Sequence, residues 1–165
     1  MTADAAERRV PADAAALFNP AYCAAILHRT SSGYESASGS GLPYALAFLA
    51  LPLILHPATA ERLPTTSKSR LHNWLIGNPD VMVGLADRAR SLAPFARDAI
   101  AFGIQGRILH FVEPSLLVPL SSSQIGKWEK RPYNIMTAKR SLVLGKSLSQ
   151  ISEVSTVFSL FGVRP

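Results

Sequence analysis

The sequence has little cysteine and little charge. Cys23 is the only cysteine among 165 residues, so one chain can form neither a disulfide nor a cysteine-based zinc site. Charged residues make up 17% of the chain and hydrophobic residues 48%, whereas about 25% is the charged fraction of an ordinary soluble domain. A chain with so little charge is expected to have part of its surface covered by a partner protein. With no export signal near the start, these features predict a cytoplasmic protein.

The sequence also lacks the motifs of catalytic and metal sites. No histidine pairs with another ligand at a metal-binding spacing such as HxxxH or HExxH. Cys23 and His28 lie five residues apart, which places them about 140° around a helix and prevents direct contact. No Ser/His/Asp set or carboxylate pair stands out, and GIQG at 103–106 lacks the context of a phosphate loop. We therefore expect no enzyme, no metal and no cofactor.

No apolar run is long enough to cross a membrane. The uncharged run from Leu42 to Leu55 is shorter than the ~20 residues that a spanning helix needs, and it contains Pro43 and Pro52. It is therefore expected in the core, covered on all sides either by its own domain or by a second protein, with no membrane role. Because Pro52 is expected to break a helix, residues 43–50 are predicted as either a short helix or an extended segment.

What is present indicates one mainly helical domain. Residues 1–16 are alanine-rich and expected to be disordered or frayed, while 17–165 are expected to form a single domain around one core. Asn19-Pro20 begins a helix that Gly33 is expected to end, followed by a serine-glycine loop over 30–41. Further helices are predicted from His56-Pro57, over 69–77, from Asn78-Pro79 to Pro94, and from Pro94 to Gly106.

A β-hairpin is predicted next, with strands at 108–112 and 116–120 around Glu113-Pro114-Ser115. Helices followed by a hairpin over 69–120 resemble the order of a winged-helix unit. A helical segment over 137–161 is then expected, capped by Thr137 and divided into two helices near Gly145 and Ser152. The predicted fold class is mainly α with a small β-hairpin (α+β), with a winged-helix-like unit as one option.

Positive charge is concentrated near the C-terminal end. After Leu120 there are 7 basic and 2 acidic residues, which is +5 of the net +6. Lys139 and Arg140 are expected in the first turn of a helix, where the helix dipole disfavours cations and where an anionic partner would compensate. A solvated face, a protein contact and a nucleic-acid contact all remain open interpretations. The basic residues concerned are Lys127, Lys130, Arg131, Lys139 and Arg140.

Several longer stretches resemble a known family. They are FNPAYCAAIL at 18–27, GLPYALAFLALPLILHPATAERLP at 41–64, SRLHNWLIGNPDVMVGLADRARSLAPFARDAIAFGIQG at 69–106 and VFSLFGVRP at 157–165. Together they resemble the middle component of bacterial three-component ABC systems. The resemblance implies a partner ATPase of the ABC type, related to chromosome-maintenance and DNA-repair ATPases, a variable effector protein, and a role in bacterial conflict such as defence against phage. It implies no catalytic residues.

Two hypotheses for function follow. The first is a non-catalytic adaptor between the ATPase and the effector. Its expected contacts are exposed apolar side chains and supporting charges, namely Trp74, Phe158, Phe161, Lys139 and Arg140. For each aromatic residue the alternative is an ordinary core position. The second is a winged-helix regulator that binds nucleic acid through Lys127, Lys130, Arg131, Lys139 and Arg140. The first hypothesis also leaves room for direct DNA contact within an ATPase complex.

Overall fold

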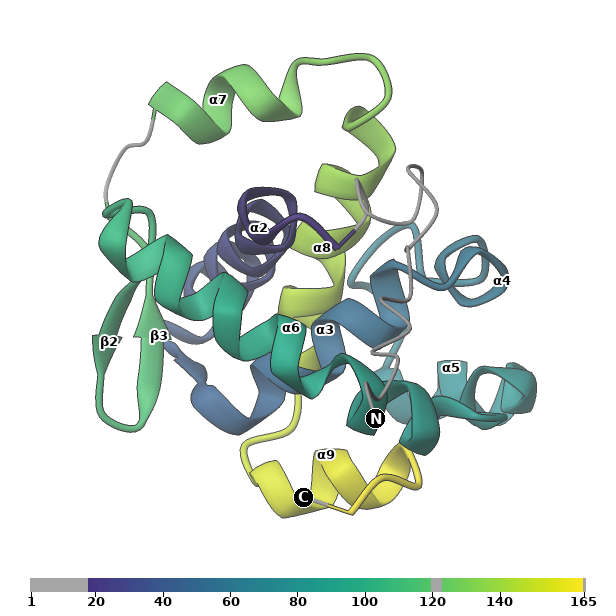
Figure 1. Ribbon diagram of the computed structural model, residues 1–165. Coiled ribbons are helices and arrows are strands. Elements are labelled where there is room, and N and C mark those ends of the chain that lie inside the picture. Colours follow the sequence, from purple (N-terminus) through teal and green to yellow (C-terminus); the bar gives the residue numbers. More distant parts are fainter. Residues whose placement is uncertain (1–17, 120–122, 165) are drawn as a thin grey trace, which may run out of the picture.

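The computed structural model describes residues 18–119 and 123–164 and is mainly helical with a small antiparallel sheet, as predicted (Figure 1). The expected frayed segment 1–16 lies outside the described residues. The helices are α2 (Pro20–Ser38), α3 (Tyr44–Ile54), α4 (Pro57–Ala60), α5 (Leu71–Gly77), the 3₁₀ helix η1 (Pro79–Met82), α6 (Leu85–Gln105), α7 (Ser123–Glu129), α8 (Ile135–Leu148) and α9 (Val154–Leu160). The strands are β1 (Leu42–Pro43), β2 (His110–Val112) and β3 (Ser115–Leu117).

The helices α2 and α8 form the centre of the molecule and pack more extensively on each other than any other pair of elements. The expectation that α2 ends at Gly33, before a loop over 30–41, is wrong: the helix continues to Ser38, and Gly39 ends it with a left-handed backbone. Gly33 serves helix packing instead, because a Cβ there would overlap the backbone carbonyl of Leu142 in α8. The hydroxyls of Ser36 and Ser38 donate to the carbonyls of Gly33 and Tyr34, three and four residues back, and are therefore compatible with a helix.

The uncharged run lies in the core, as predicted, and it is helical. α3 continues through Pro52 to Ile54, so the expected break at Pro52 is wrong. A proline inside a helix costs about 3 kcal/mol, but each fully buried leucine contributes about 1.5–3 kcal/mol. Leu49, Leu51 and Leu53 are all completely buried, so burial outweighs the lost backbone hydrogen bond. α3 contacts α2, α6 and α8, which cover most of its surface, while Tyr44, Ala45 and Phe48 on its remaining face are half-buried.

α6 also continues through a proline. The helix expected from Asn78 is only η1, after which Gly84 adopts a left-handed backbone and α6 starts at Leu85. Pro94 is expected to break or kink the helix; the break is wrong, since Pro94 is on the exposed face while Ala96, Ala99 and Ile100 anchor the helix in the core. The segment 69–120 therefore contains α5, η1 and one long helix before the hairpin, and the winged-helix comparison is not confirmed.

The predicted hairpin is present with shorter strands. β2 and β3 pair antiparallel, with Phe111 opposite Leu116, and Glu113-Pro114 connects them. β1 was not predicted: it pairs with the other edge of β3 and gives the strand order β1-β3-β2. Leu42 and Leu116 face each other across this pair and are fully buried, so the sheet closes one end of the helical core.

The division of the C-terminal segment into two helices is confirmed, with α8 ending at Leu148 and α9 beginning at Val154. Two details differ from the prediction. Asn134, not Thr137, occupies the N-cap position of α8, so Lys139 and Arg140 lie in its second turn, where the dipole argument for an anionic partner does not apply. Gly145 lies inside α8 and packs against the Thr30 carbonyl of α2.

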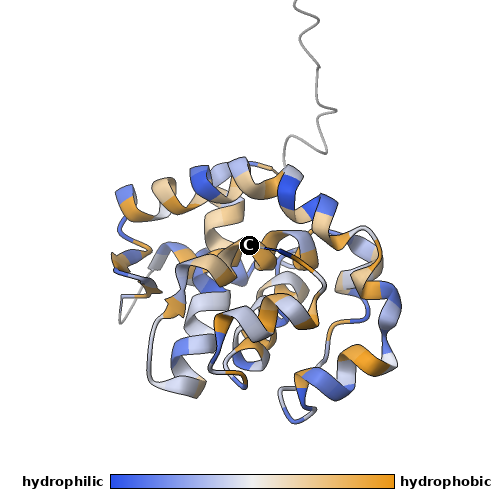
Figure 2. Cartoon of the chain, turned by 90° about the horizontal axis from the view of Figure 1, so that it is seen from below, coloured by the Kyte–Doolittle hydropathy of each residue, from blue (hydrophilic) through white to orange (hydrophobic). Residues whose placement is uncertain are grey.

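Most helices carry hydrophobic and hydrophilic residues in alternation, as expected for elements that are buried on one face (Figure 2). Their buried faces meet in one cluster of side chains that extends from α2 and α3 to Phe161 and Val163. Across residues 18–119 and 123–164, none of the helices combines the length and the apolar character that crossing a bilayer requires.

Candidate functional site

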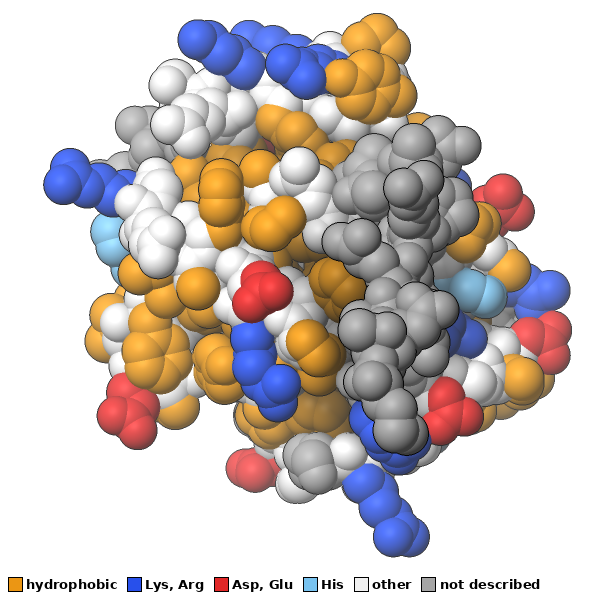
Figure 3. Space-filling view, in the orientation of Figure 1, with side chains coloured by type: hydrophobic (Ala, Val, Ile, Leu, Met, Phe, Trp, Pro, Cys, Tyr) orange, Lys and Arg blue, Asp and Glu red, His pale blue; other side chains and the backbone are white. Residues whose placement is uncertain are grey.

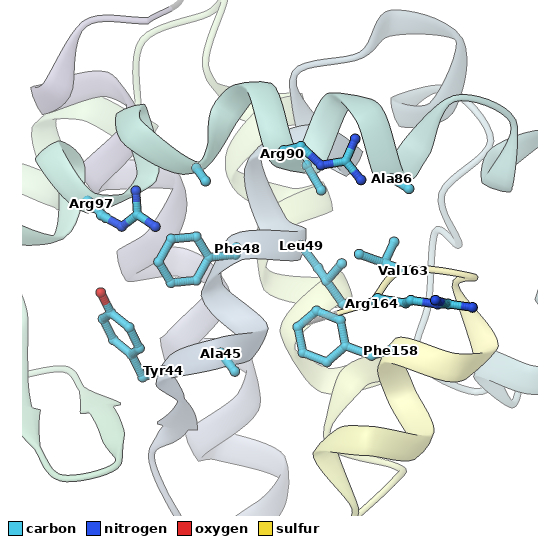
Figure 4. Close-up of a pocket in the computed structure, with 12 residues that line it drawn as sticks. Tyr44, Ala45, Phe48, Leu49, Ala86, Arg90, Arg97, Phe158, Val163 and Arg164 are labelled. Carbon is cyan, nitrogen blue, oxygen red and sulfur yellow. The ribbon is translucent and has the colours of Figure 1, made fainter.

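An apolar groove of about 490 Å³ lies between α3, α6 and the C-terminal segment that contains α9 (Figure 4). Its floor consists of the buried side chains of Leu49, Ala89, Phe158 and Val163. The volume falls within the range of roughly 300–1,000 Å³ that is usual for ligand pockets. In Figure 3, orange side chains line the hollow below α6 and blue side chains lie beside it.

Small side chains on α6 create the hollow. The residues that α6 contributes are Ala86, Ala89, Arg90, Ala93 and Arg97. Apart from the adjacent Ala89 and Arg90, neighbouring members are three or four residues apart, so they form one stripe along the helix. Because three of the five are alanine, α6 lies over α3 without filling the space between the two helices. A larger side chain in this stripe would occupy the groove.

Aromatic rings form the opposite wall and extend beyond it. Tyr44 contacts Phe48 edge-on with ring centroids 5.2 Å apart, and it contacts Phe111 of β2 in the same manner at 5.7 Å. Phe111 is 47% exposed and its neighbour Val112 is 58% exposed. The apolar surface therefore continues from the groove past Tyr44 onto the outer strand of the sheet.

The rim carries three arginines, and none of the described residues that line the groove has a carboxylate. Figure 4 shows Arg97 beside Tyr44 and Phe48 at one end, and Arg90 and Arg164 towards the other. The guanidinium of Arg97 lies 5.8 Å from the Phe48 ring centroid, a cation–π distance. Arg90 forms an exposed ion pair with Asp87 at 2.9 Å. Among the described residues, Arg97 and Arg164 have no carboxylate partner.

These groups suit binding. The lining residues provide guanidinium groups, one phenol and apolar surface, but no imidazole, thiol or carboxylate that could act as a nucleophile or general base. Within the two described ranges, no three His, Cys, Asp or Glu side chains gather in a way that could hold a metal ion. The arrangement can bind an apolar group and attract negative charge around it.

The structure places the three predicted aromatic contacts differently from the expectation of exposed side chains. Phe158 and Phe161 are only 4% and 1% exposed, so that expectation is wrong for both, because they anchor α9 to the core. Phe158 nevertheless forms part of the groove floor. Trp74 on α5 is half-buried, and its indole N–H donates to the Arg62 carbonyl at 2.9 Å.

The predicted basic residues form a surface separate from the groove. Lys127, Lys130 and Arg131 are exposed on α7 and just after it, and Figure 3 shows blue side chains over α7 along the upper edge. Lys139 is exposed and Arg140 half-buried on α8, where both line a small hollow of about 50 Å³ with Glu61. None of these five residues lines the groove.

A second, more polar hollow of about 380 Å³ lies between α2 and α7. Arg29 and Glu129 face each other across it at 3.2 Å, and Glu35 accepts the Val118 backbone N–H at 3.2 Å. His28 is 6% exposed, and neither ring nitrogen has a hydrogen-bond partner among the residues that the structure describes. Burial, assisted by the adjacent Arg29 charge, lowers the pKa of His28 from 6.5 to about 4, so its ring is neutral at pH 7.

Sequence reasoning missed the groove. The stripe of alanine and arginine on α6 is visible in the sequence as a three-and-four spacing, and it could have indicated a shallow helix face. Its pairing with Tyr44 and Phe48 depends on how α3 crosses α6, and the contribution of Arg164 depends on where the chain returns after α9. No local pattern carries that information.

Comparison with known proteins gives one family. Residues 8–165 match the model described as ABC-three component (ABC-3C) system Middle Component 3. No curated protein and no solved structure matches the chain significantly. The match covers almost the whole sequence and agrees with the resemblance carried by the segments between residues 18 and 165. The chain therefore belongs to the family of Middle Component 3 proteins of ABC-three component systems.

Proposed function

We propose that this protein is a non-catalytic adaptor that couples an ABC-type ATPase to an effector protein in a bacterial conflict or anti-phage defence system. Family membership over residues 8–165 is the observation that carries the proposal, since it makes the chain one component of a three-component system. A middle component that joins two others must present binding surface rather than reactive groups.

The exposed side chains support this role. Phe111 and Val112 on β2, together with Phe102 and Ile104 near the end of α6, are large apolar residues that the described chain leaves partly open to solvent. Apolar surface of this kind is typical of protein contacts when it is contiguous. The groove adds aromatic and arginine side chains, the residue types that contribute most to protein interfaces.

Co-purification with the products of the neighbouring genes tests the adaptor role. The tagged chain, co-expressed with those products, should retain the ABC-type ATPase at both low and raised salt, because contacts through apolar surface are only weakly screened. The ATPase expressed without the tagged chain is the control for resin binding. A folded, monodisperse chain that retains neither neighbouring product at either salt concentration would contradict the proposal.

The defence role has its own test. Cells that carry the whole system should resist a panel of phages, and deletion of this chain should remove that resistance while the ATPase and effector are still produced. Resistance that persists without this chain would contradict an obligatory coupling function. Immunoblots of the other two components distinguish loss of coupling from loss of expression.

Nucleic-acid binding is the second candidate function, and the exposed Lys127, Lys130 and Arg131 favour it. Binding through these residues, with Lys139 and Arg140, should weaken steeply with salt because it releases counterions from the phosphates. Charge reversal of the three residues around α7 should then abolish retention of duplex DNA by the isolated chain. Salt-insensitive or undetectable DNA binding by the wild-type chain would remove this alternative, including its winged-helix form.

A further inference from the structure

We propose that the groove between α3, α6 and the C-terminal segment receives one amphipathic helical segment of the partner ATPase, with apolar side chains in the groove and carboxylates on the arginine rim. The inference rests on the proposed adaptor function and specifies which surface performs it. It concerns residues that neither the family description nor the sequence motifs assign.

The shape of the groove favours a helix as its occupant. Its long wall is a helical stripe in which Ala86, Ala89 and Ala93 keep the surface low, and its other wall is the aromatic pair of Tyr44 and Phe48. An amphipathic helix that lays its apolar face between two helices is a recurring mode of recognition. Phe111, in contact with Tyr44, extends the apolar track and offers a further anchor to a segment longer than the groove.

The distribution of polar groups favours a protein segment over a small molecule as the occupant of the groove. Small-molecule sites usually place a few polar groups inside the pocket, where they fix the orientation of the ligand. Here the charged groups lie on the rim, and Arg90, Arg97 and Arg164 are all exposed. A rim of charge around an apolar floor is the anatomy of a protein contact.

The rim also predicts the charge pattern of the partner. Arg90 and Arg97 are seven residues apart on α6, which corresponds to about 10 Å along the helix axis. A helix that runs alongside α6 would meet them with Asp or Glu at positions i and i+7, and with apolar residues at i+3 and i+4 facing the groove. Arg90 can exchange its exposed Asp87 partner for a new carboxylate, because such surface pairs contribute only about 0–1 kcal/mol.

Arg97 and Arg164 are the best positioned to select an acidic segment. Neither has a carboxylate partner among the described residues, and Arg97 is held against the Phe48 ring. Docking would remove water from both guanidinium groups and strengthen their attraction to a carboxylate. The same residues would repel a basic segment, so they provide specificity as well as affinity.

The experiment measures the affinity of the full-length chain for the purified ATPase that is encoded beside it. We expect the double variant Arg97→Glu/Arg164→Glu to bind at least tenfold more weakly than wild type, and Ala93→Trp, which fills the groove, to have a similar effect. Arg70→Glu is the matched control, because Arg70 is an exposed arginine outside the groove lining and should leave affinity within twofold. Thermal unfolding of each variant checks that it remains folded.

A labelling measurement does not depend on a disruptive variant. Ala93→Cys places a thiol in the wall of the groove, while burial raises the pKa of the native Cys23 thiol to about 11 and makes it a slow internal reference. A maleimide should label the introduced thiol of the Ala93→Cys variant rapidly in the isolated chain, and bound ATPase should slow that labelling at least tenfold. Equal labelling with and without the ATPase would overturn the proposal.

The outcomes separate the two levels of inference. If wild type binds the ATPase and the groove variants bind equally well, the adaptor function stands and the groove assignment is overturned. If wild type binds neither neighbouring product, both the adaptor function and the groove assignment are overturned. The groove assignment would also be overturned if the isolated chain were a dimer that the Ala93→Trp substitution dissociates. It would likewise be overturned if native mass spectrometry showed a small compound bound to wild type but not to the Ala93→Trp variant. Recovery of binding to the double variant when partner carboxylates are changed to arginine would establish it.

Discussion

Gly33 and Gly145 determine how closely the two central helices approach. A Cβ at Gly33 would overlap the carbonyl of Leu142, and a Cβ at Gly145 would overlap the carbonyl of Thr30. The two glycines thus serve the same contact from opposite sides, and each opposes a backbone atom that cannot move independently of its helix. In an isolated helix both would be unfavourable by about 1 kcal/mol relative to alanine. Packing between α2 and α8 outweighs that preference.

Replacing either glycine by alanine should therefore destabilise the fold. We expect Gly33→Ala and Gly145→Ala each to lower the free energy of unfolding by about 2 kcal/mol or more, because the strain of overpacking exceeds the gain in helix propensity. Gly77→Ala is the matched control: it lies at the end of α5 with no atom near its would-be Cβ, so it should be neutral or stabilising. Urea unfolding of the three variants provides the comparison. Equal stability of Gly33→Ala and Gly77→Ala would contradict this account.

His28 should make the fold sensitive to acid. The unfolded chain takes up a proton near pH 6.5, whereas the folded chain resists protonation of His28 until about pH 4, the pKa of the buried ring. This contribution to stability is therefore complete above pH 6.5 and is lost as the pH falls towards 4. Because proton binding is linked to folding, this pKa difference should lower the free energy of unfolding by about 2 kcal/mol between pH 7 and pH 5.

The variant His28→Leu isolates that effect. It removes two ring nitrogens that have no hydrogen-bond partner and keeps an apolar group in the same buried position, so it should be at least as stable as wild type at pH 5. Urea unfolding of both proteins at pH 7 and pH 5 measures the difference in pH dependence. A wild-type chain that loses no more stability than the variant over this interval would refute the prediction.

At the scale of elements, α3 and α6 each contain an internal proline, at which the sequence alone predicts that the helix ends. Pro52 in α3 is buried, whereas Pro94 in α6 is exposed. Each lacks the N–H that would bond to the carbonyl four residues earlier. Both helices persist because their apolar residues are anchored by several neighbouring elements at once.

Pro94→Ala should consequently stabilise the protein. The substitution restores a backbone hydrogen bond to the Arg90 carbonyl and removes little buried surface, because Pro94 is exposed; a gain of up to about 3 kcal/mol is expected. Ser91→Ala, an exposed substitution in the same helix, controls for propensity and should contribute only about 0.5 kcal/mol. Calorimetry would show a higher Tm for Pro94→Ala than for Ser91→Ala. A lower Tm would mean that the packing of α6 depends on proline at position 94.

At the scale of the whole molecule, two kinds of surface lie apart. The apolar groove and the exposed face of β2 adjoin each other through Tyr44, whereas the basic residues Lys127, Lys130 and Arg131 lie around α7. The proposed adaptor function requires two contact surfaces, and these are the two candidates: the groove for an acidic amphipathic segment, and the basic surface around α7 for a second acidic partner.

Hydrogen exchange should map the first of these surfaces. When the ATPase is bound, peptides that cover residues 110–117 and 157–164 should exchange more slowly, because they contain the hairpin and the C-terminal wall of the groove. A peptide that covers α7 serves as the internal control and should change only if the ATPase also occupies the basic surface. Protection confined to α7 would indicate that the groove faces solvent in the complex.

The sequence by itself determined the composition of the fold and many of its local features. The mainly helical class, the buried run at 42–55, the hairpin around Glu113-Pro114 and the division between α8 and α9 follow from periodicity and turn residues, which are local properties of the chain. The family could also be identified from its segments.

Only the tertiary structure decided where helices end and where the groove lies. Gly33, Pro52 and Pro94 resemble end points because local propensity disfavours them within helices, yet packing against distant elements offsets that preference. The groove requires Phe48 of α3, Arg97 of α6 and Arg164 after α9, which are far apart in the sequence and meet only when the core forms. Phe158 and Phe161 are in the core for the same reason: burial depends on contacts across the whole chain, which the local sequence does not contain.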